Sequence, residues 1–129
     1  MSAYYFAEAG GEAPMRIWFV GILFVLAAFL YLYKGFSDTE NIALNMTALF
    51  AFGVALFPME WGCGEQCNPV TIHGACAVAL FLCIAFVAIW CANDTLPLLK
   101  NPALEARYRK LYRWLGALMI VSPLLAFVL

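Results

Sequence analysis

Long apolar segments are the feature that most constrains what this chain can fold into. They cover approximately residues 15–34, 38–58, 70–92 and 108–129, and a helix of about 20 apolar residues is what the hydrocarbon core of a bilayer requires. Apolar residues make up 66% of the 129-residue chain and charged residues 12%, whereas soluble domains contain roughly 45–50% and about 25%. The sequence therefore predicts an all-α, polytopic transmembrane four-helix bundle, with residues 1–129 forming a single membrane domain.

Short polar signals mark where the helices should begin. Ser37 and Glu40 have the spacing of a capping box, in which the hydroxyl and the carboxylate each accept a backbone N–H. Asn101 followed by Pro102 is typical of an N-cap with proline at the first helical position. We expect the second helix to begin at the first signal and the last helix to begin near the second.

The basic residues predict the orientation of the chain in the membrane. Of the seven, Arg16 precedes the first span, Lys34 follows it, and five precede the last span: Lys100, Arg107, Arg109, Lys110 and Arg113. Positive charge stays on the inner side, so both termini and the loop 59–69 are expected outside and the basic interfacial segment 93–113 inside. Four side chains of that segment are expected to reach lipid headgroups: Arg107, Arg109, Lys110 and Arg113.

Chemistry-bearing residues concentrate between the second and third spans. Glu60 follows the end of the second helix, and His73, the one histidine of the chain, begins the third. A short loop should bring carboxylate and imidazole to the same membrane face, and a carboxylate that fixes the tautomer of an imidazole is a common arrangement in general bases. The alternative is a buried hydrogen bond that closes the helix hairpin.

A stripe along the third span contains further candidates. At 100° per residue, six residues fall on one side of a helix: His73, Cys76, Leu80, Cys83, Val87 and Cys91. His73 and Cys76, with Asn45 of the second span, are candidate ligand-binding residues. The alternative is that the cysteines are small apolar residues that let helices approach each other, and that Asn45 and Thr47 face other helices.

The loop cysteines allow two kinds of site. Cys63 and Cys67 are expected to form a disulfide, because an oxidising exterior permits one. With His73 they would supply three ligands of a zinc ion, whose fourth ligand would be Glu60, Glu65 or water. Haem ligation by two histidines is excluded because the sequence contains one. No cofactor is required by the sequence.

Several segments carry a resemblance to a known superfamily. They are residues 53–60 with Phe57, Pro58 and Glu60, residues 72–75 with His73, the apolar run 77–86, and residues 93–96, 108–112 and 122–124. In these the sequence resembles the damage-regulated autophagy modulator (DRAM) and Sfk-type superfamily, which includes bacterial members. The resemblance implies a polytopic membrane protein linked with lipid handling, sensing or complex assembly, and it supplies no established catalytic mechanism for Glu60 or His73. Members usually have five or six spans, whereas four are expected here.

The expected function is that of a non-catalytic accessory subunit or lipid-contacting scaffold in a larger membrane complex. Its expected partners are the lipid bilayer and other membrane subunits, in a homo- or hetero-oligomer, in the bacterial inner (plasma) membrane. The alternative is a membrane-embedded redox or hydrolytic protein that uses Glu60 and His73 with haem, quinone or a metal. A transporter is disfavoured because no charged residue falls at the middle of a span, and no basic and aromatic patch indicates nucleic-acid binding.

Overall fold

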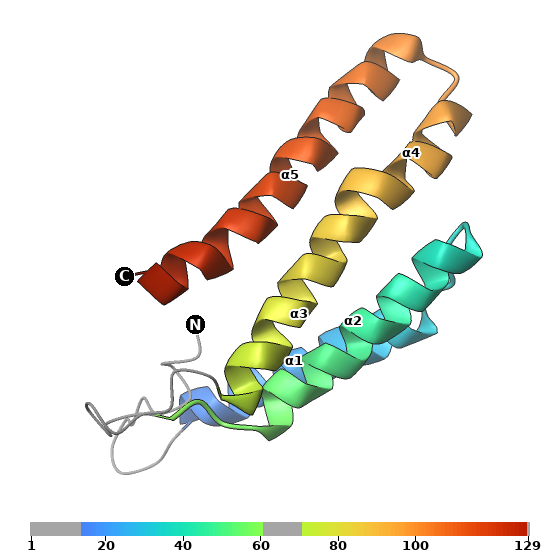
Figure 1. Ribbon diagram of the computed structural model, residues 1–129. Coiled ribbons are helices and arrows are strands. Elements are labelled where there is room, and N and C mark those ends of the chain that lie inside the picture. The colour runs from blue at the N-terminus through green and yellow to red at the C-terminus, as the bar shows by residue number, and fades with distance from the viewer. Residues whose placement is uncertain (1–13, 61–70, 129) are drawn as a thin grey trace.

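The computed structural model describes residues 14–60 and 71–128, and every regular element in these ranges is helical. Four rods follow one another along the chain (Figure 1). They are α1 (Pro14–Leu32), α2 (Asp38–Leu56), a composite rod of α3 (Ile72–Phe86), the π-helix η3 (Val87–Cys91), α4 (Ala92–Thr95) and the 3₁₀-helix η4 (Leu96–Leu98), and α5 (Pro102–Val128). The predicted all-α class is confirmed for the part of the chain that the structure describes.

Three of the rods are long and apolar enough to cross a membrane. The segments are Met15–Leu32, Asp38–Leu56 and Ile72–Leu98, with mean hydropathies of 2.2, 1.2 and 2.7. At 1.5 Å per residue, the first two extend about 28 Å, close to the roughly 30 Å of a bilayer core. The chain is therefore a membrane protein. In α5 the charged residues lie in the first half and an apolar stretch follows.

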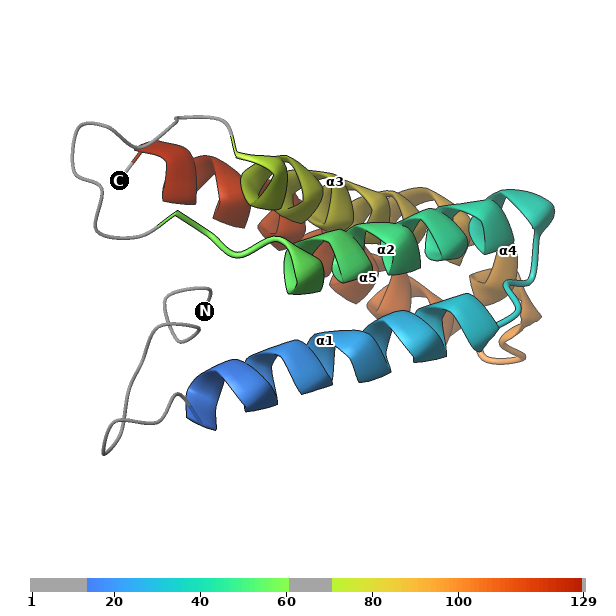
Figure 2. The same cartoon turned by 90° about the horizontal axis from the view of Figure 1, so that it is seen from below.

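The rods pack in chain order as an open series. α2 packs against α1 on one side and α3 on the other, and α5 packs against α3 and η3. Within residues 14–60 and 71–128, α1 does not pack against α3 or α5. Consecutive rods run antiparallel, so the α1–α2 and α4–α5 turns lie on one side of the molecule (Figures 1 and 2). The start of α1 and the end of α5 lie on the opposite side.

The α1–α2 turn shows why α2 begins where it does. The Ser37 hydroxyl accepts the backbone N–H of Glu40 at 3.2 Å, and the Glu40 carboxylate accepts the N–H of Phe36 at 2.9 Å. The predicted cap is confirmed, with the carboxylate reaching one residue further back than in a standard capping box. At Gly35, a Cβ atom would lie 2.7 Å from the backbone nitrogen of Asn41. This close approach explains a glycine at the turn.

The two later helix starts also have side-chain caps, without a reciprocal carboxylate. Thr71 accepts the N–H of Gly74 at 3.0 Å and begins α3. The Asn101 side chain accepts the N–H of Ala103 at 3.0 Å, which confirms the predicted start of the last helix. The third rod stays helical beyond the expected end near Ala92, to Leu98.

Small side chains occupy the most deeply buried positions between the helices. The fully buried residues in the described ranges are alanines and one threonine: Ala27, Ala48, Ala51, Ala85 and Thr47. Large apolar side chains face outward instead, for example Leu32 at 77% and Trp114 at 70% exposure. Helices in lipid gain nothing from burying large apolar groups and associate through small residues that let backbones approach. This distribution is what a membrane protein requires.

A π-helical segment marks the contact between the third rod and α5. η3 inserts an extra residue per turn, and the Asn93 side chain donates to the Ile89 carbonyl oxygen at 2.9 Å. On α5, a Cβ atom at Gly116 would overlap the Ile89 side chain. Gly116 therefore fits directly against the π-helical segment.

Candidate functional site

His73 joins the end of α2 to the start of α3. Its Nδ1 lies 2.7 Å from the carbonyl oxygen of Phe57, and the residue is 5% exposed. Because a carbonyl oxygen only accepts, Nδ1 carries the hydrogen and donates it. Phe57 is the C-cap residue of α2, where carbonyls lack intrahelical partners. The imidazole thus satisfies a terminal carbonyl of α2 and ties the helix hairpin together.

Glu60 lies in the segment that leaves α2, three residues after the carbonyl that His73 binds, and it is exposed. The His73–Phe57 hydrogen bond brings this segment alongside the first turn of α3. The structure therefore places Glu60 and His73 at the same end of the α2–α3 hairpin. The use of the two groups as a catalytic pair stays a prediction.

Cys76 lies one turn after His73 and packs against the backbone of α2. A Cβ atom at Gly53 would lie 2.5 Å from the Cys76 Sγ and 3.1 Å from its Cβ. A glycine facing a small thiol lets the two helices approach closely. Close packing against Gly53 therefore explains why a small residue such as Cys76 occupies this position.

The first half of the stripe that contains Cys76 faces α2, through His73, Cys76 and Leu80. His73, Leu80 and Cys91 are buried, whereas Cys76, Cys83 and Val87 are half-buried. The Thr47 hydroxyl donates to the Ala43 carbonyl oxygen at 2.7 Å, and the residue is fully buried. Thr47 faces another helix, as expected. From His73 to Leu80, the periodicity of the stripe thus reflects the α2–α3 interface.

Asn45 lies apart from the other two candidate ligand residues. It precedes Gly53 by eight residues on α2, which is about 12 Å along the helix axis. It shares its side of α2 with Phe52, whose ring packs edge-on against Phe24 of α1 at 5.2 Å between centroids. Its Oδ1 is buried without a hydrogen-bond partner among the described residues. The structure therefore brings His73 and Cys76 together, but not Asn45.

The predicted disulfide lies outside the described residues, because Cys63 and Cys67 fall within residues 61–70. Glu65, the alternative zinc ligand, lies there as well. In the ranges 14–60 and 71–128, no three side chains of His, Cys, Asp or Glu gather as metal ligands would. The described cysteines, Cys76, Cys83 and Cys91, are free thiols.

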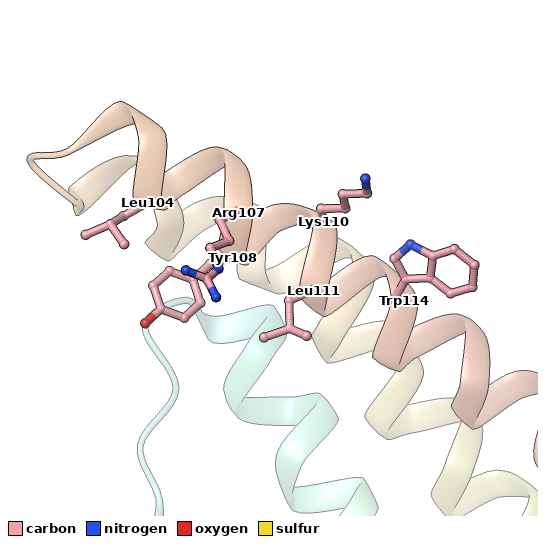
Figure 3. A pocket seen from close by; sticks show the side chains of 6 residues that line it. All are labelled: Leu104, Arg107, Tyr108, Lys110, Leu111 and Trp114. Carbon is pink, nitrogen blue, oxygen red and sulfur yellow. The ribbon is translucent and has the colours of Figure 1, made fainter.

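A second candidate site lies on the first half of α5. A hollow of about 480 Å³, here called the α5 hollow, is lined by Leu104, Arg107, Tyr108, Lys110, Leu111 and Trp114 (Figure 3). All six come from one helix, with spacings of three or four residues that place neighbours on the same side. Arg107 and Tyr108 lie on one flank, and Lys110 and Trp114 on the other (Figure 3). The hollow combines two cations, two amphipathic aromatic rings and two leucines.

The other basic residues of α5 do not line this hollow. Arg109 forms an ion pair with Glu105, one turn earlier on the same helix, and its Nε has no hydrogen-bond partner in the described part of the chain. Arg113 is exposed. The four expected headgroup ligands are therefore not equivalent, because Arg107 and Lys110 share a hollow and Arg109 is held by a carboxylate. Sequence reasoning missed Glu105, although its spacing of four from Arg109 was the available signal.

A third feature is an apolar groove of about 470 Å³ between the first half of α3 and the second half of α5. It is lined by Gly74, Ala75, Val78, Ala79, Leu82, Ile120, Pro123 and Leu124. Small residues of α3 leave the space, and no charged group lines it. The groove faces the hydrocarbon if both helices cross the membrane.

Comparison of the sequence and the structure with known protein families, curated proteins and solved structures finds no match.

Proposed function

We propose that this chain is a non-catalytic subunit of a membrane complex, which packs its helices against lipids and other membrane subunits. The observation that carries the proposal is the outward placement of many large apolar side chains around a core whose fully buried residues are alanines and one threonine. Such a chain offers its neighbours a large exposed apolar surface. Its resemblance to the DRAM and Sfk-type superfamily agrees with a role in lipid handling or complex assembly.

The exposed side of α1 is the most suitable surface for another subunit. α1 packs against α2 alone within the described ranges, and Ala27 is its one buried residue there. Ile22 and Phe29 are 64% and 69% exposed. Aromatic and aliphatic side chains of this kind can pack against a neighbouring helix or against lipid.

The proposal includes a fourth span and an orientation. The apolar half of α5 crosses the bilayer, so both termini lie outside and the basic turns lie inside, in the plasma membrane of a bacterium. The support is the placement of Lys34 and Lys100 in the two turns that share one side of the molecule (Figure 2), because basic residues are retained on the inner side.

Site-specific photo-crosslinking in native membranes tests the subunit role. A benzophenone side chain at Phe29 should give a discrete adduct with one membrane protein, because that position is exposed on α1. Trp90 is the comparison position, because it is similarly exposed (58%) but lies on η3, in another rod. A lipid adduct alone at both positions, together with a solitary protomer after mild detergent extraction, would show that the proposal is wrong.

The alternative function, a redox or hydrolytic protein that uses Glu60 and His73, is tested by a separate measurement. A haem-binding protein would show a Soret band, and one that disappears in His73→Ala would overturn the non-catalytic assignment. The hydrogen bond from Nδ1 to Phe57 supports a structural use of this histidine.

A further inference from the structure

The length of α5 would place the α5 hollow near the phosphates of the lipids if this helix crosses the bilayer, as proposed above. α5 contains 27 residues, which at 1.5 Å per residue is about 40 Å, longer than the roughly 30 Å hydrocarbon core. If the C-terminal apolar half lies in the hydrocarbon, the turns that carry Arg107 and Lys110 lie among the headgroups. Trp114, at the C-terminal end of the hollow, and Tyr108 belong to the residue types that concentrate at this boundary.

The charge of the hollow favours an anion. Arg107 and Lys110 line it, both exposed, and no acidic residue does. The acidic residue nearest in sequence, Glu105, is paired with Arg109 and does not line the hollow. Like charges at neighbouring helix positions destabilise a helix slightly, and a bound anion would offset this repulsion. The charged groups of Arg107 and Lys110 lie on opposite flanks of the hollow (Figure 3), so both side chains would turn inward to hold one phosphate. The segment 102–113 has four basic side chains and one acidic side chain, a net charge of +3.

The apolar part of the hollow distinguishes a lipid from a free phosphate. Leu104, Leu111 and the Trp114 ring contribute surface that a soluble anion would not use. A phospholipid with its phosphate between the cations can lay its glycerol and first acyl carbons against Leu111 and Trp114. From Arg107 and Lys110 towards Leu111 and Trp114 the lining changes from cationic to apolar, in the same order as a phospholipid from its phosphate to its acyl chains, and Leu104 adds an apolar group at the N-terminal end.

We propose that the α5 hollow is a binding site for one anionic glycerophospholipid, whose phosphate is held by Arg107 and Lys110. This inference rests on the proposed lipid-contacting role and names the lipid class and the residues that select it. Arg109 and Arg113 contribute to the general positive potential and not to the site.

Native mass spectrometry of the full chain, released from detergent micelles containing phosphatidylglycerol or phosphatidylcholine, tests the site. The unaltered protein should retain one phosphatidylglycerol in preference to phosphatidylcholine. The double variant Arg107→Gln with Lys110→Gln should weaken retention by about tenfold, since each basic side chain near a membrane surface contributes appreciably to anionic lipid binding. Arg109→Gln with Arg113→Gln is the matched control, because it removes the same charge from the same helix and should change retention less than about threefold.

Three outcomes would overturn the assignment. Equal losses in the two double variants would indicate a diffuse electrostatic attraction. Equal retention of the two lipids by the unaltered protein would remove the selectivity. Displacement of the lipid by millimolar inorganic phosphate or glycerol 3-phosphate would identify a free-phosphate site. The Phe29 crosslink reports on the subunit role independently, so a protein that forms the crosslink but fails to select the lipid contradicts this site and leaves the proposed function standing.

Discussion

At the scale of single residues, His73 is expected to stabilise the α2–α3 hairpin. Replacing it by leucine removes the donor to the Phe57 carbonyl oxygen and leaves a partly buried acceptor without its partner. The expected cost is about 1–3 kcal/mol in the free energy of unfolding. Titration of the purified protein with a denaturing detergent, followed by circular dichroism, measures it.

Asparagine at the same position is the matched control. His73→Asn has a side chain of similar size to leucine but keeps an N–H donor near the position of Nδ1. It should recover most of the stability that His73→Leu loses. If the two variants are equally destabilised, the hydrogen bond contributes little, and the role of His73 must come from other contacts of its ring.

The sequence indicated this region of the molecule but not the atoms involved. The concentration of polar residues around Glu60 and His73 predicted a hairpin with two ionisable groups at one end, which is where the structure places them. It could not predict that the imidazole donates to a backbone carbonyl, because backbone acceptors leave no trace in a pattern of side chains. The capping signals at Ser37 and Asn101 were readable because a side chain itself supplies the acceptor.

At the scale of elements, the spacing between α2 and α3 is expected to depend on Gly53. Gly53→Ala places a Cβ atom 2.5 Å from the Cys76 Sγ, so the helices must separate or the thiol must move. Overpacking of this kind costs about 1–3 kcal/mol. Adding Cys76→Ala removes the sulfur and should recover part of the loss, giving a coupling free energy of about 0.5–3 kcal/mol between the two sites.

Gly21→Ala is the control for the intrinsic effect of alanine in a helix. Gly21 lies in α1, where a Cβ atom would have nothing within 4 Å. The variant should change the free energy of unfolding by less than about 1 kcal/mol, towards higher stability. A loss at Gly21 equal to that at Gly53 would contradict the close-approach explanation. Detergent-induced unfolding of the single and double variants measures all these terms.

The element boundaries show what apolar patterns predict and what they miss. Capping signals and the lengths of the apolar segments predicted where the helices lie, and α2 begins at the predicted residue. The π-helical segment Val87–Cys91 was not predicted, because an apolar stretch looks the same in either helix type. Its position depends on contacts between distant residues, such as Ile89 with Gly116. The arrangement of the helices as an open series also depends on contacts between distant residues, which the periodicity of apolar residues in the sequence does not reveal.

At the scale of the whole molecule, the charge distribution predicts a single orientation with four crossings. Lys34 lies in the α1–α2 turn and Lys100 in the turn before α5, and basic residues are retained on the inner side of the membrane. Glu60, at the end of the first hairpin, should therefore be accessible from outside. The same is expected of Ala126, near the end of α5, because the apolar half of that helix is proposed to cross the bilayer.

Cysteine labelling in intact cells with a membrane-impermeant maleimide tests this orientation. In a background with Cys63 and Cys67 replaced by serine, Glu60→Cys and Ala126→Cys should react directly, whereas Lys100→Cys should react only after permeabilisation. Reaction of Lys100→Cys alone would reverse the orientation. If Glu60→Cys reacts in intact cells and Ala126→Cys requires permeabilisation, α5 does not cross, and the protein has three spans with its basic helix at the inner surface. Only the predicted pattern agrees with a chain that has four membrane crossings and places the α5 hollow among the headgroups of the inner leaflet.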